Sequence, residues 1–359
     1  MMPGFVRLKT FDKHLATIWT ISWSSFGELL FSCGADGTIF IWGPICQSIY
    51  RNINSKKTME KLKFSKWNNL CRFESFLDFK TFRNITYSFN ASQFCASSFS
   101  GISQLCKISF FNGKKFVTLK KKNILIGPVS EIKSCNYSPD KNYICISSRN
   151  KTIWVWEKDL KNNYKFFIII KENDGDIKCT KWYPRHKYLV TSSYGGIINF
   201  YKKKKKNLFY NGSIFISNTI IWNINFNEDG KEFYYSTNQG EVSGFLKTKK
   251  LYYYLICSTI SIPFFLWSNY TSSIVCTNNE ESSNILFRCK FLLKKKNLQF
   301  FFGGVSKFFR IKFEKSLVCP HIGDINSLAW HPNNNNIIAS CGDDLTIYIW
   351  HYTQGELFF

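Results

Sequence analysis

The feature that most constrains the fold of this chain is an internal repeat. Residues 22–42 (SWSSFGELLFSCGADGTIFIW) align with residues 329–350 (AWHPNNNNIIASCGDDLTIYIW). Both read as an apolar run, a turn, a second apolar run, an acidic turn and a third run ending in Trp. The same frame returns at residues 136–156, 181–201 and 225–245, and in weaker form at 86–106 and 267–287. Short apolar runs between turn residues predict β-strands, and a repeat of this length predicts one structural unit per copy.

The repeats end at seven equivalent positions, which are Trp42, Cys106, Trp156, Tyr201, Phe245, Phe287 and Trp350. Successive positions are 64, 50, 45, 44, 42 and 63 residues apart, so the first and sixth repeats are followed by extra loops. The pattern resembles the WD40 family, which implies an all-β, seven-bladed β-propeller without helices. Because one blade cannot bury both of its faces, residues 1–359 are expected to form a single domain. Residues 5–11 alternate suitably to pair with the last blade and close the ring.

Two repeats carry a complete set of polar residues at matching positions: His14, Ser32, Asp36 and Trp42 in the first, and His321, Ser340, Asp344 and Trp350 in the last. In the WD40 unit these side chains form a hydrogen-bonded chain, which rigidifies a buried turn when every member is satisfied. The middle repeats have lost parts of the set, since Pro128, Asn173 and Ser217 replace the His and Ser100, Asn150 and Gly195 replace the Asp. We expect those blades to be less regular.

A Ser, a His and an Asp together also occur in hydrolases. Here the trio recurs in separate repeats, whereas a nucleophile needs one cleft with an oxyanion site. The 13 cysteines include no pair at C-x-x-C spacing, and no phosphate-binding loop or paired-carboxylate site was found. We therefore predict a protein that is not an enzyme, with no catalytic residue, metal site or cofactor. The cysteines lie mostly in apolar runs, as reduced thiols of a cytosolic-type compartment do.

The charge of the chain is strongly positive, at +24. Of the 48 basic residues 40 are Lys and only 8 are Arg, although Arg is the side chain that reads phosphates in a bidentate manner. This composition is typical of an A+T-rich, reduced genome, and it disfavours a dedicated nucleic-acid role. Residues 202–206 are all Lys and are expected to form a solvated hairpin loop, with a nuclear-import signal as the alternative.

Residues 251–279 contain no charged side chain and are long enough to cross a membrane. Ser, Thr, Tyr and Asn recur throughout and Pro263 interrupts the run, so two neighbouring buried strands are the better interpretation. The first residues show no apolar run of signal-peptide length. We expect a cytoplasmic protein, with a nuclear pool or the equivalent compartment of a reduced endosymbiont as further possibilities.

In a propeller, partners usually dock on the rim formed by the residue before the turn Asp and by the residues that flank the first apolar residue of each innermost strand. The turns contribute Ala35, Phe99, Arg149, Tyr194, Asn238 and Asp343, and the innermost strands contribute Trp19, Arg83, Lys133, Asp176, Lys178, Trp222 and Asp324. Arg149, Trp19 and Trp222 are the first candidates, because exposed Arg and Trp are common interface anchors. The alternative for each Trp is packing against the neighbouring blade.

Four segments carry a more specific resemblance. Residues 32–43, 131–157, 175–194 and 321–344 are similar to the WD40 subunit of the cytosolic iron–sulfur protein assembly targeting complex, including the string SSRNKTIWVWE at 147–157. The resemblance implies a non-enzymatic adaptor that helps to deliver preformed clusters to cytosolic and nuclear apoproteins. The implied partners are the other targeting subunits, an iron-only-hydrogenase-like cluster carrier and apo client proteins. The arginine of that family's docking face corresponds to Arg149.

Two other classes of function remain open. One is a different WD40 adaptor, such as a ubiquitin-ligase receptor or a ribosome-assembly factor, because the scaffold alone does not specify a partner. The other is a nucleic-acid binder attracted by the positive charge, whose binding would fall steeply with added salt.

Overall fold

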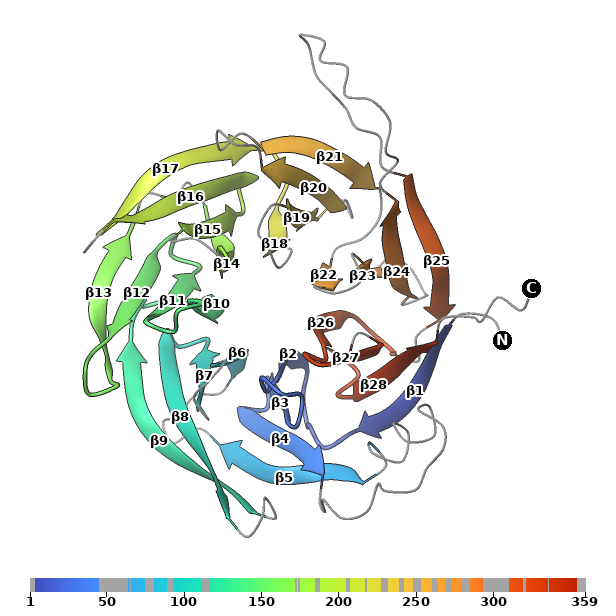
Figure 1. Cartoon of the computed structure of the whole chain (residues 1–359). Helices are drawn as coiled ribbons and strands as arrows, with labels where there is room; N and C mark the ends of the chain where they lie inside the picture. The colour runs from blue at the N-terminus through green and yellow to red at the C-terminus, as the bar shows by residue number, and fades with distance from the viewer. Residues whose placement is uncertain are drawn as a thin grey trace. The chain divides into compact units, whose positions relative to one another are not determined.

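The computed structural model describes residues 4–44, 64, 66–74, 81–88, 93–111, 116–171, 173, 175–184, 188–204, 207–216, 218–226, 232–238, 242–247, 253–259, 264–268, 273–278, 285–292, 310–318, 321–334 and 336–353. Between residues 242 and 318 it describes the backbone. The elements assigned in these ranges are all β-strands. They form four-stranded antiparallel sheets (Figure 1). The chain divides into two compact units, Met1–Lys171 with His321–Phe359, and Glu172–Pro320.

Sixteen of the described strands form four sheets in the first unit. In spatial order, the first sheet contains β1 (Gly4–Phe11), β28 (Ile347–Thr353), β27 (Ile337–Gly342) and β26 (Ile325–Trp330). The second contains β2 (Ile18–Trp23), β3 (Leu30–Gly34), β4 (Thr38–Pro44) and β5 (Trp67–Glu74). The third contains β6 (Phe82–Tyr87), β7 (Gln93–Ser98), β8 (Ile102–Phe111) and β9 (Phe116–Ile126), and the fourth β10 (Ile132–Tyr137), β11 (Tyr143–Ser148), β12 (Ile153–Lys158) and β13 (Tyr164–Ile170).

The second unit contains three sheets in its described residues, each in chain order. They are β14 (Ile177–Trp182), β15 (Tyr188–Ser193), β16 (Ile197–Lys204) and β17 (Asn207–Phe215); β18 (Ile221–Phe226), β19 (Glu232–Thr237), β20 (Val242–Lys247) and β21 (Tyr253–Thr259); and β22 (Phe264–Ser268), β23 (Ser273–Asn278), β24 (Ile285–Leu292) and β25 (Arg310–Val318).

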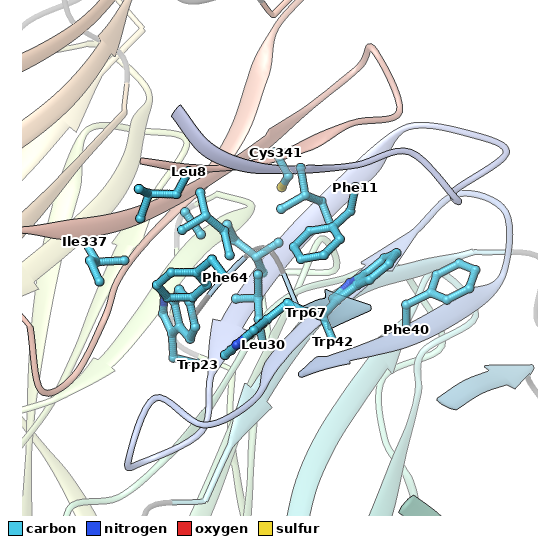
Figure 2. Close-up of a cluster of buried hydrophobic side chains, with 14 of the residues drawn as sticks. Leu8, Phe11, Trp23, Leu30, Phe40, Trp42, Phe64, Trp67, Ile337 and Cys341 are labelled. Atoms are coloured by element: carbon cyan, nitrogen blue, oxygen red, sulfur yellow. The ribbon is translucent and has the colours of Figure 1, made fainter. Parts of the chain in front are cut away.

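The first and last strands of the chain share a sheet. β1 lies antiparallel along β28, with pairs running from Phe11↔Ile347 to Gly4↔Thr353 (Figure 1). Leu8 and Phe11 point into a core that also holds Trp23 and Trp42, and the Phe11 and Trp42 rings stack with centroids 4.4 Å apart (Figure 2). The first strand therefore contributes both backbone pairing and apolar burial.

Sheets of the first unit are joined through their innermost strands. Trp23 Nε1 donates to the carbonyl of Ala329 on β26 at 3.0 Å, and Thr20 Oγ1 donates to the carbonyl of Arg83 on β6 at 2.8 Å. The second strands are buried on both faces, as in β7, β11 and β27, where all six residues are buried. A sheet sandwiched in this way needs continuous apolar or small residues rather than strict alternation.

Two sequence predictions need correction. Residues 251–279 contribute three strands rather than two, namely β21, β22 and β23, because the uncharged run divides into three short strands. Lys202, Lys203 and Lys204 belong to β16 and pair with β17, so the hairpin extends into the lysine run that we expected to be a loop. The extra loops after the first and sixth repeats, and the side chains of Phe245 and Phe287, lie outside the described residues.

Candidate functional site

The innermost strands share a backbone irregularity at one position. In six sheets one residue is skipped in a strand pairing, just after the first buried apolar residue of the earlier strand. The pairings are β2–β3, β6–β7, β10–β11, β14–β15, β18–β19 and β26–β27. The skipped residues are Trp19, Arg83, Lys133, Lys178, Trp222 and Asn326. A β-bulge bends its strand and redirects the extra side chain, often beside a functional site. Five of these six positions were predicted from the sequence, and Asn326 was not.

A second repeated feature is a hydrogen bond from the turn after the second strand. The backbone N–H of Arg149 donates to the carbonyl of Glu131 at 2.9 Å, and that of Tyr194 donates to Asp176 at 2.8 Å. The same bond recurs for Ala35 to Thr17, Phe99 to Thr81, Asn238 to Ile220 and Asp343 to Asp324. The bond places each predicted turn residue beside the start of its innermost strand. In each of these six sheets, therefore, the turn residue and the bulge strand of the prediction lie together.

In the first unit, Trp19 contacts two residues of the neighbouring sheet. The guanidinium carbon of Arg83 lies 4.2 Å from the centre of the Trp19 ring, and the ring of Phe99 lies 6.2 Å away. Trp19 is half-buried and Phe99 is 39% exposed. A cation over an indole face is favourable, and more so when both are partly desolvated. Trp19 thus packs against the neighbouring sheet while part of it remains accessible.

Glu131 connects two of the bulge residues. Its carboxylate lies 3.5 Å from Arg83 Nε and 2.7 Å from Lys133 Nζ. The side chains are 21%, 10% and 15% exposed for Arg83, Glu131 and Lys133. Burial lowers the pKa of Arg83, and the negative charge of Glu131 opposes that shift. Sequence reasoning missed Glu131, although an acidic residue directly before a strand that carries Lys133 was a usable signal.

Arg149 lies on the exposed β11–β12 turn of the same sheet. Its own N–H donates to the carbonyl of Glu131, so the backbone of Arg149 lies beside the residue that joins Arg83 and Lys133. A long side chain at an exposed turn fills no core.

Asp324 and Asp343 lie on the sheet that contains β1 and are both exposed. Asn326 Nδ2 donates to Asp343 Oδ1 at 2.8 Å and to the carbonyl of Ile18 at 3.2 Å. Burial, with the nearby charge of Asp343, raises the pKa of Asp324. The rim residues predicted in this sheet are thus two neighbouring aspartates, whereas Arg83 and Lys133 are basic.

In the second unit, Lys178 is held between aromatic rings. Its ammonium lies 5.3 Å from the centre of Tyr194 and 5.1 Å from the centre of Trp222, and 3.7 Å from a carboxylate oxygen of Asp176. Tyr194 is 55% exposed, Trp222 is half-buried, and the Lys178 side chain is 9% exposed. Trp222 thus packs on Lys178 of a neighbouring sheet and keeps part of its surface accessible. All four residues were predicted from the sequence.

The first polar set forms a continuous hydrogen-bonded chain. His14 Nδ1 donates to Asp36 Oδ2 at 2.8 Å, and this bond fixes the tautomer so that Nε2 accepts from Ser32 Oγ at 2.8 Å. Ser32 in turn accepts from Trp42 Nε1 at 2.9 Å. Ser32 is fully buried. A hydroxyl engaged on both sides and closed to solvent tightens the turn and is not placed to attack a substrate.

The last polar set repeats this geometry. His321 Nδ1 donates to Asp344 at 2.9 Å, His321 Nε2 lies 2.8 Å from Ser340 Oγ, and Trp350 Nε1 donates to Ser340 Oγ at 2.9 Å. In the fourth repeat Asn173 takes the place of the His. Its side-chain oxygen accepts from Asn199 Nδ2 at 3.1 Å and Tyr201 OH at 3.2 Å, so a different polar network replaces the set.

Among the described residues, no group of three or more His, Cys, Asp or Glu side chains is placed to hold a metal ion. In the same ranges the structure contains no helix with the length and apolar character required to cross a bilayer.

Comparison with known proteins matches three ranges of the sequence to a repeat family. A family model described as "WD domain, G-beta repeat" matches residues 5–43, 119–157 and 314–351. The chain carries WD40 repeats. Each matched WD40 range ends in the third strand of a repeat, at β4, β12 and β28. These are the two WD40 repeats with complete polar sets and the one that carries Arg149.

Curated relatives of the WD40 chain match it in parts. It is 34% identical over 68 residues to probable cytosolic iron-sulfur protein assembly protein 1 of Chaetomium globosum, covering 17% of the chain and 15% of that protein. Identity to the protein of the same name in Neurospora crassa is 31% over 93 residues, covering 20% of each. Identity to meiotic fizzy-related protein 2 of Schizosaccharomyces pombe is 26% over 159 residues, covering 42% of the chain and 30% of that protein. The WD40 chain thus spans at most 30% of the length of these relatives.

Proposed function

We propose that this WD40 chain is a non-enzymatic adaptor in cytosolic iron–sulfur protein assembly, which docks partners and helps to deliver preformed clusters to apoproteins. The observation that carries the proposal is the set of redirected side chains on the innermost strands, joined to exposed turn residues that include Arg149. Two of the partial relatives carry names that refer to cytosolic iron–sulfur protein assembly, and these names suggest the process in which the adaptor takes part. The match to the fizzy-related protein is longer, but its sequence identity is lower. A different WD40 adaptor is therefore our second candidate function.

The proposed architecture is one closed, seven-bladed propeller over residues 1–359. The support is the repeated four-stranded sheet and the pairing of β1 with β28 in one sheet. The proposed compartment is the cytoplasm, or its equivalent in a reduced endosymbiont, with a nuclear pool if clients are nuclear.

The proposed partners are the other targeting subunits, an iron-only-hydrogenase-like cluster carrier and apo iron–sulfur clients. Affinity purification of the full chain followed by mass spectrometry tests this set. Recovery of the carrier and the targeting subunits supports the proposal. Recovery of cullin-type ligase subunits or pre-ribosomal proteins in their place contradicts it, and salt-sensitive recovery of RNA would favour the nucleic-acid class.

Arg149→Glu tests the docking surface directly. We expect a loss of partner recovery of more than about tenfold, because charge reversal at an Arg anchor costs about 2 kcal/mol or more. The melting temperature should stay within about 2 °C of the parent, since surface changes shift stability by about 0.5 kcal/mol or less. The measurement is a quantitative pull-down beside a thermal unfolding scan.

Lys161→Glu is the matched control. Lys161 is also exposed, but it lies in the β12–β13 turn, at the opposite end of β12 from Arg149. The same charge change there should leave partner recovery intact. Equal losses in both variants would show that net charge, and not the Arg149 position, governs binding.

A further inference from the structure

Two thiols on neighbouring sheets of the first unit are in direct contact. Cys135 Sγ, on β10, lies 3.2 Å from Cys95 Sγ, on β7, although the residues are 40 positions apart. Both are buried, at 1% and 0% exposure, in one apolar cluster. The contact is therefore a feature of sheet packing.

Two other described thiols contact carbonyl oxygens. Cys145 Sγ contacts the carbonyl of Asn136 at 3.5 Å, and Cys341 Sγ contacts that of Ile18 at 3.7 Å. At these contacts the thiol is a hydrogen-bonded core group beside an oxygen. The Cys95–Cys135 pair differs in that each sulfur faces a second one.

We propose that Cys95 and Cys135 form a redox site, in which a hydroperoxide converts the two thiols into a disulfide that joins the β6–β9 sheet to the β10–β13 sheet. A disulfide has its sulfurs about 2.0 Å apart, so these two must approach by about 1 Å. Rotation of two short side chains within a packed interface is the movement required. The link would cross between sheets and not within one.

The reaction balances with the peroxide as the only co-reactant. One thiolate attacks the peroxide oxygen, which forms a sulfenic acid and releases water or an alcohol. The second sulfur then attacks the sulfenic sulfur, expels water and closes the S–S bond. In sum, two thiols lose two electrons and two protons, and the O–O bond is reduced to two hydroxyl products.

Burial makes the reaction slow and selective. Burial, reinforced by the neighbouring Cys95, raises the pKa of the Cys135 thiol well above its ordinary value, so little thiolate is present in the closed interface. Attack on peroxide therefore requires a transient opening of the β7–β10 contact. When the contact closes again after a sulfenic acid has formed, the second sulfur lies beside it, so the disulfide competes well with further oxidation.

The link would brace the strand that carries a rim residue. Cys135 is two positions after Lys133, the bulge residue of β10, which pairs with Glu131. Oxidation would tie this strand covalently to the sheet that holds Arg83. The redox site does not depend on the identity of any docking partner.

The test treats the full chain with hydrogen peroxide under native conditions. Remaining thiols are alkylated in denaturant, and the protein is digested without reductant for mass spectrometry. We expect the Cys95 and Cys135 peptides joined, with two hydrogens less than the sum of the thiol forms. Dithiothreitol should remove the link, and the oxidised protein should melt at a higher temperature than the reduced one, because a cross-link restricts the unfolded chain.

Single substitutions give the controls. Cys95→Ala should abolish the link, Cys135→Ala should do the same by an independent substitution, and Cys145→Ser should leave it intact. The melting temperature of each reduced variant checks its folding. Recovery of Cys95 and Cys135 as alkylated thiols after peroxide treatment of the parent overturns the proposal, as does their pairing with other cysteines as often as with each other.

Discussion

At the residue scale, the polar sets show how one buried carboxylate stabilises a turn. Asp36 accepts from His14, from Thr38 Oγ1 at 2.7 Å and from the N–H of Leu15 at 3.0 Å. Burial alone would raise its pKa, but these donors outweigh burial and lower the pKa from 3.8 to about 2. The folded state therefore holds this carboxylate in its charged form more strongly than the unfolded state does.

The depressed pKa of Asp36 gives a pH dependence with a definite sign. Its contribution to the free energy of unfolding is fully present above pH 3.8, declines as the pH falls below that value, and is lost as the pH passes about 2. Asp36→Asn should therefore flatten the fall in stability across this window. Urea unfolding at a series of acidic pH values measures it, and parallel curves for the two proteins would contradict the role assigned to Asp36.

Substitutions of Trp350 measure how much the last polar set contributes to the free energy of unfolding. It is 2% exposed and donates to Ser340. Trp350→Ala should lower the free energy of unfolding by about 3–5 kcal/mol, as large core truncations do. Trp350→Phe keeps most of the ring and loses the hydrogen bond, so it should cost less, although the buried Ser340 then loses a partner. Denaturant unfolding measures both, and equal losses would show that ring volume has no part in the effect.

At the element scale, turns between strands set how closely neighbouring sheets approach. Gly101, in the β7–β8 turn, has a φ of +81°, and a Cβ placed there would lie 1.7 Å from the carbonyl oxygen of Pro128. Backbone of one repeat thus closes directly on backbone of the next. Only a residue without a side chain permits both the left-handed conformation and this contact.

Gly101→Ala should therefore destabilise the fold by about 1–3 kcal/mol, from the strained φ together with the backbone clash. Gly195→Ala is the matched control, because the turn there leaves no atom within 4 Å of an added Cβ. Thermal unfolding compares the two variants. A Gly101 variant as stable as the Gly195 variant would show that the two sheets separate easily at this point.

The strands themselves were largely predictable, because alternation and turn residues are local properties of the sequence. The repeat at 22–42 contains the end of β2 followed by β3 and β4, as the apolar runs indicated. The repeat at 329–350 likewise contains the end of β26 followed by β27 and most of β28. The lysine run was misjudged, since Lys202 to Lys204 continue β16. Lys202 lies 5.6 Å from the Tyr188 ring, a cross-strand contact that offsets the repulsion and that the sequence does not reveal.

At the scale of the whole molecule, β1 links the two ends of the chain. It pairs with β28 and buries Leu8 and Phe11 at 8% and 4% exposure. Removing residues 1–11 should cost about 3–6 kcal/mol for these two side chains alone. It also leaves β28 as an unpaired edge, and exposed edges pair with other chains.

The truncated chain should therefore melt at a lower temperature and self-associate as its concentration rises. Thermal scans and size-exclusion chromatography over a range of concentrations measure the two effects. A truncated chain that stays monomeric and melts with the full-length protein would show that β1 contributes little.

The sequence by itself determined the repeat, most of the strands and the members of the polar sets, because each depends on spacing within one repeat. The tertiary structure decided which rim residues touch. Arg83 reaches Trp19 and Glu131 from a different sheet, and Asn326 reaches the carbonyl of Ile18 across most of the chain length. These contacts, like that between Cys95 and Cys135, depend on how neighbouring sheets approach and where a bulge redirects a side chain, and neither is encoded in a local pattern.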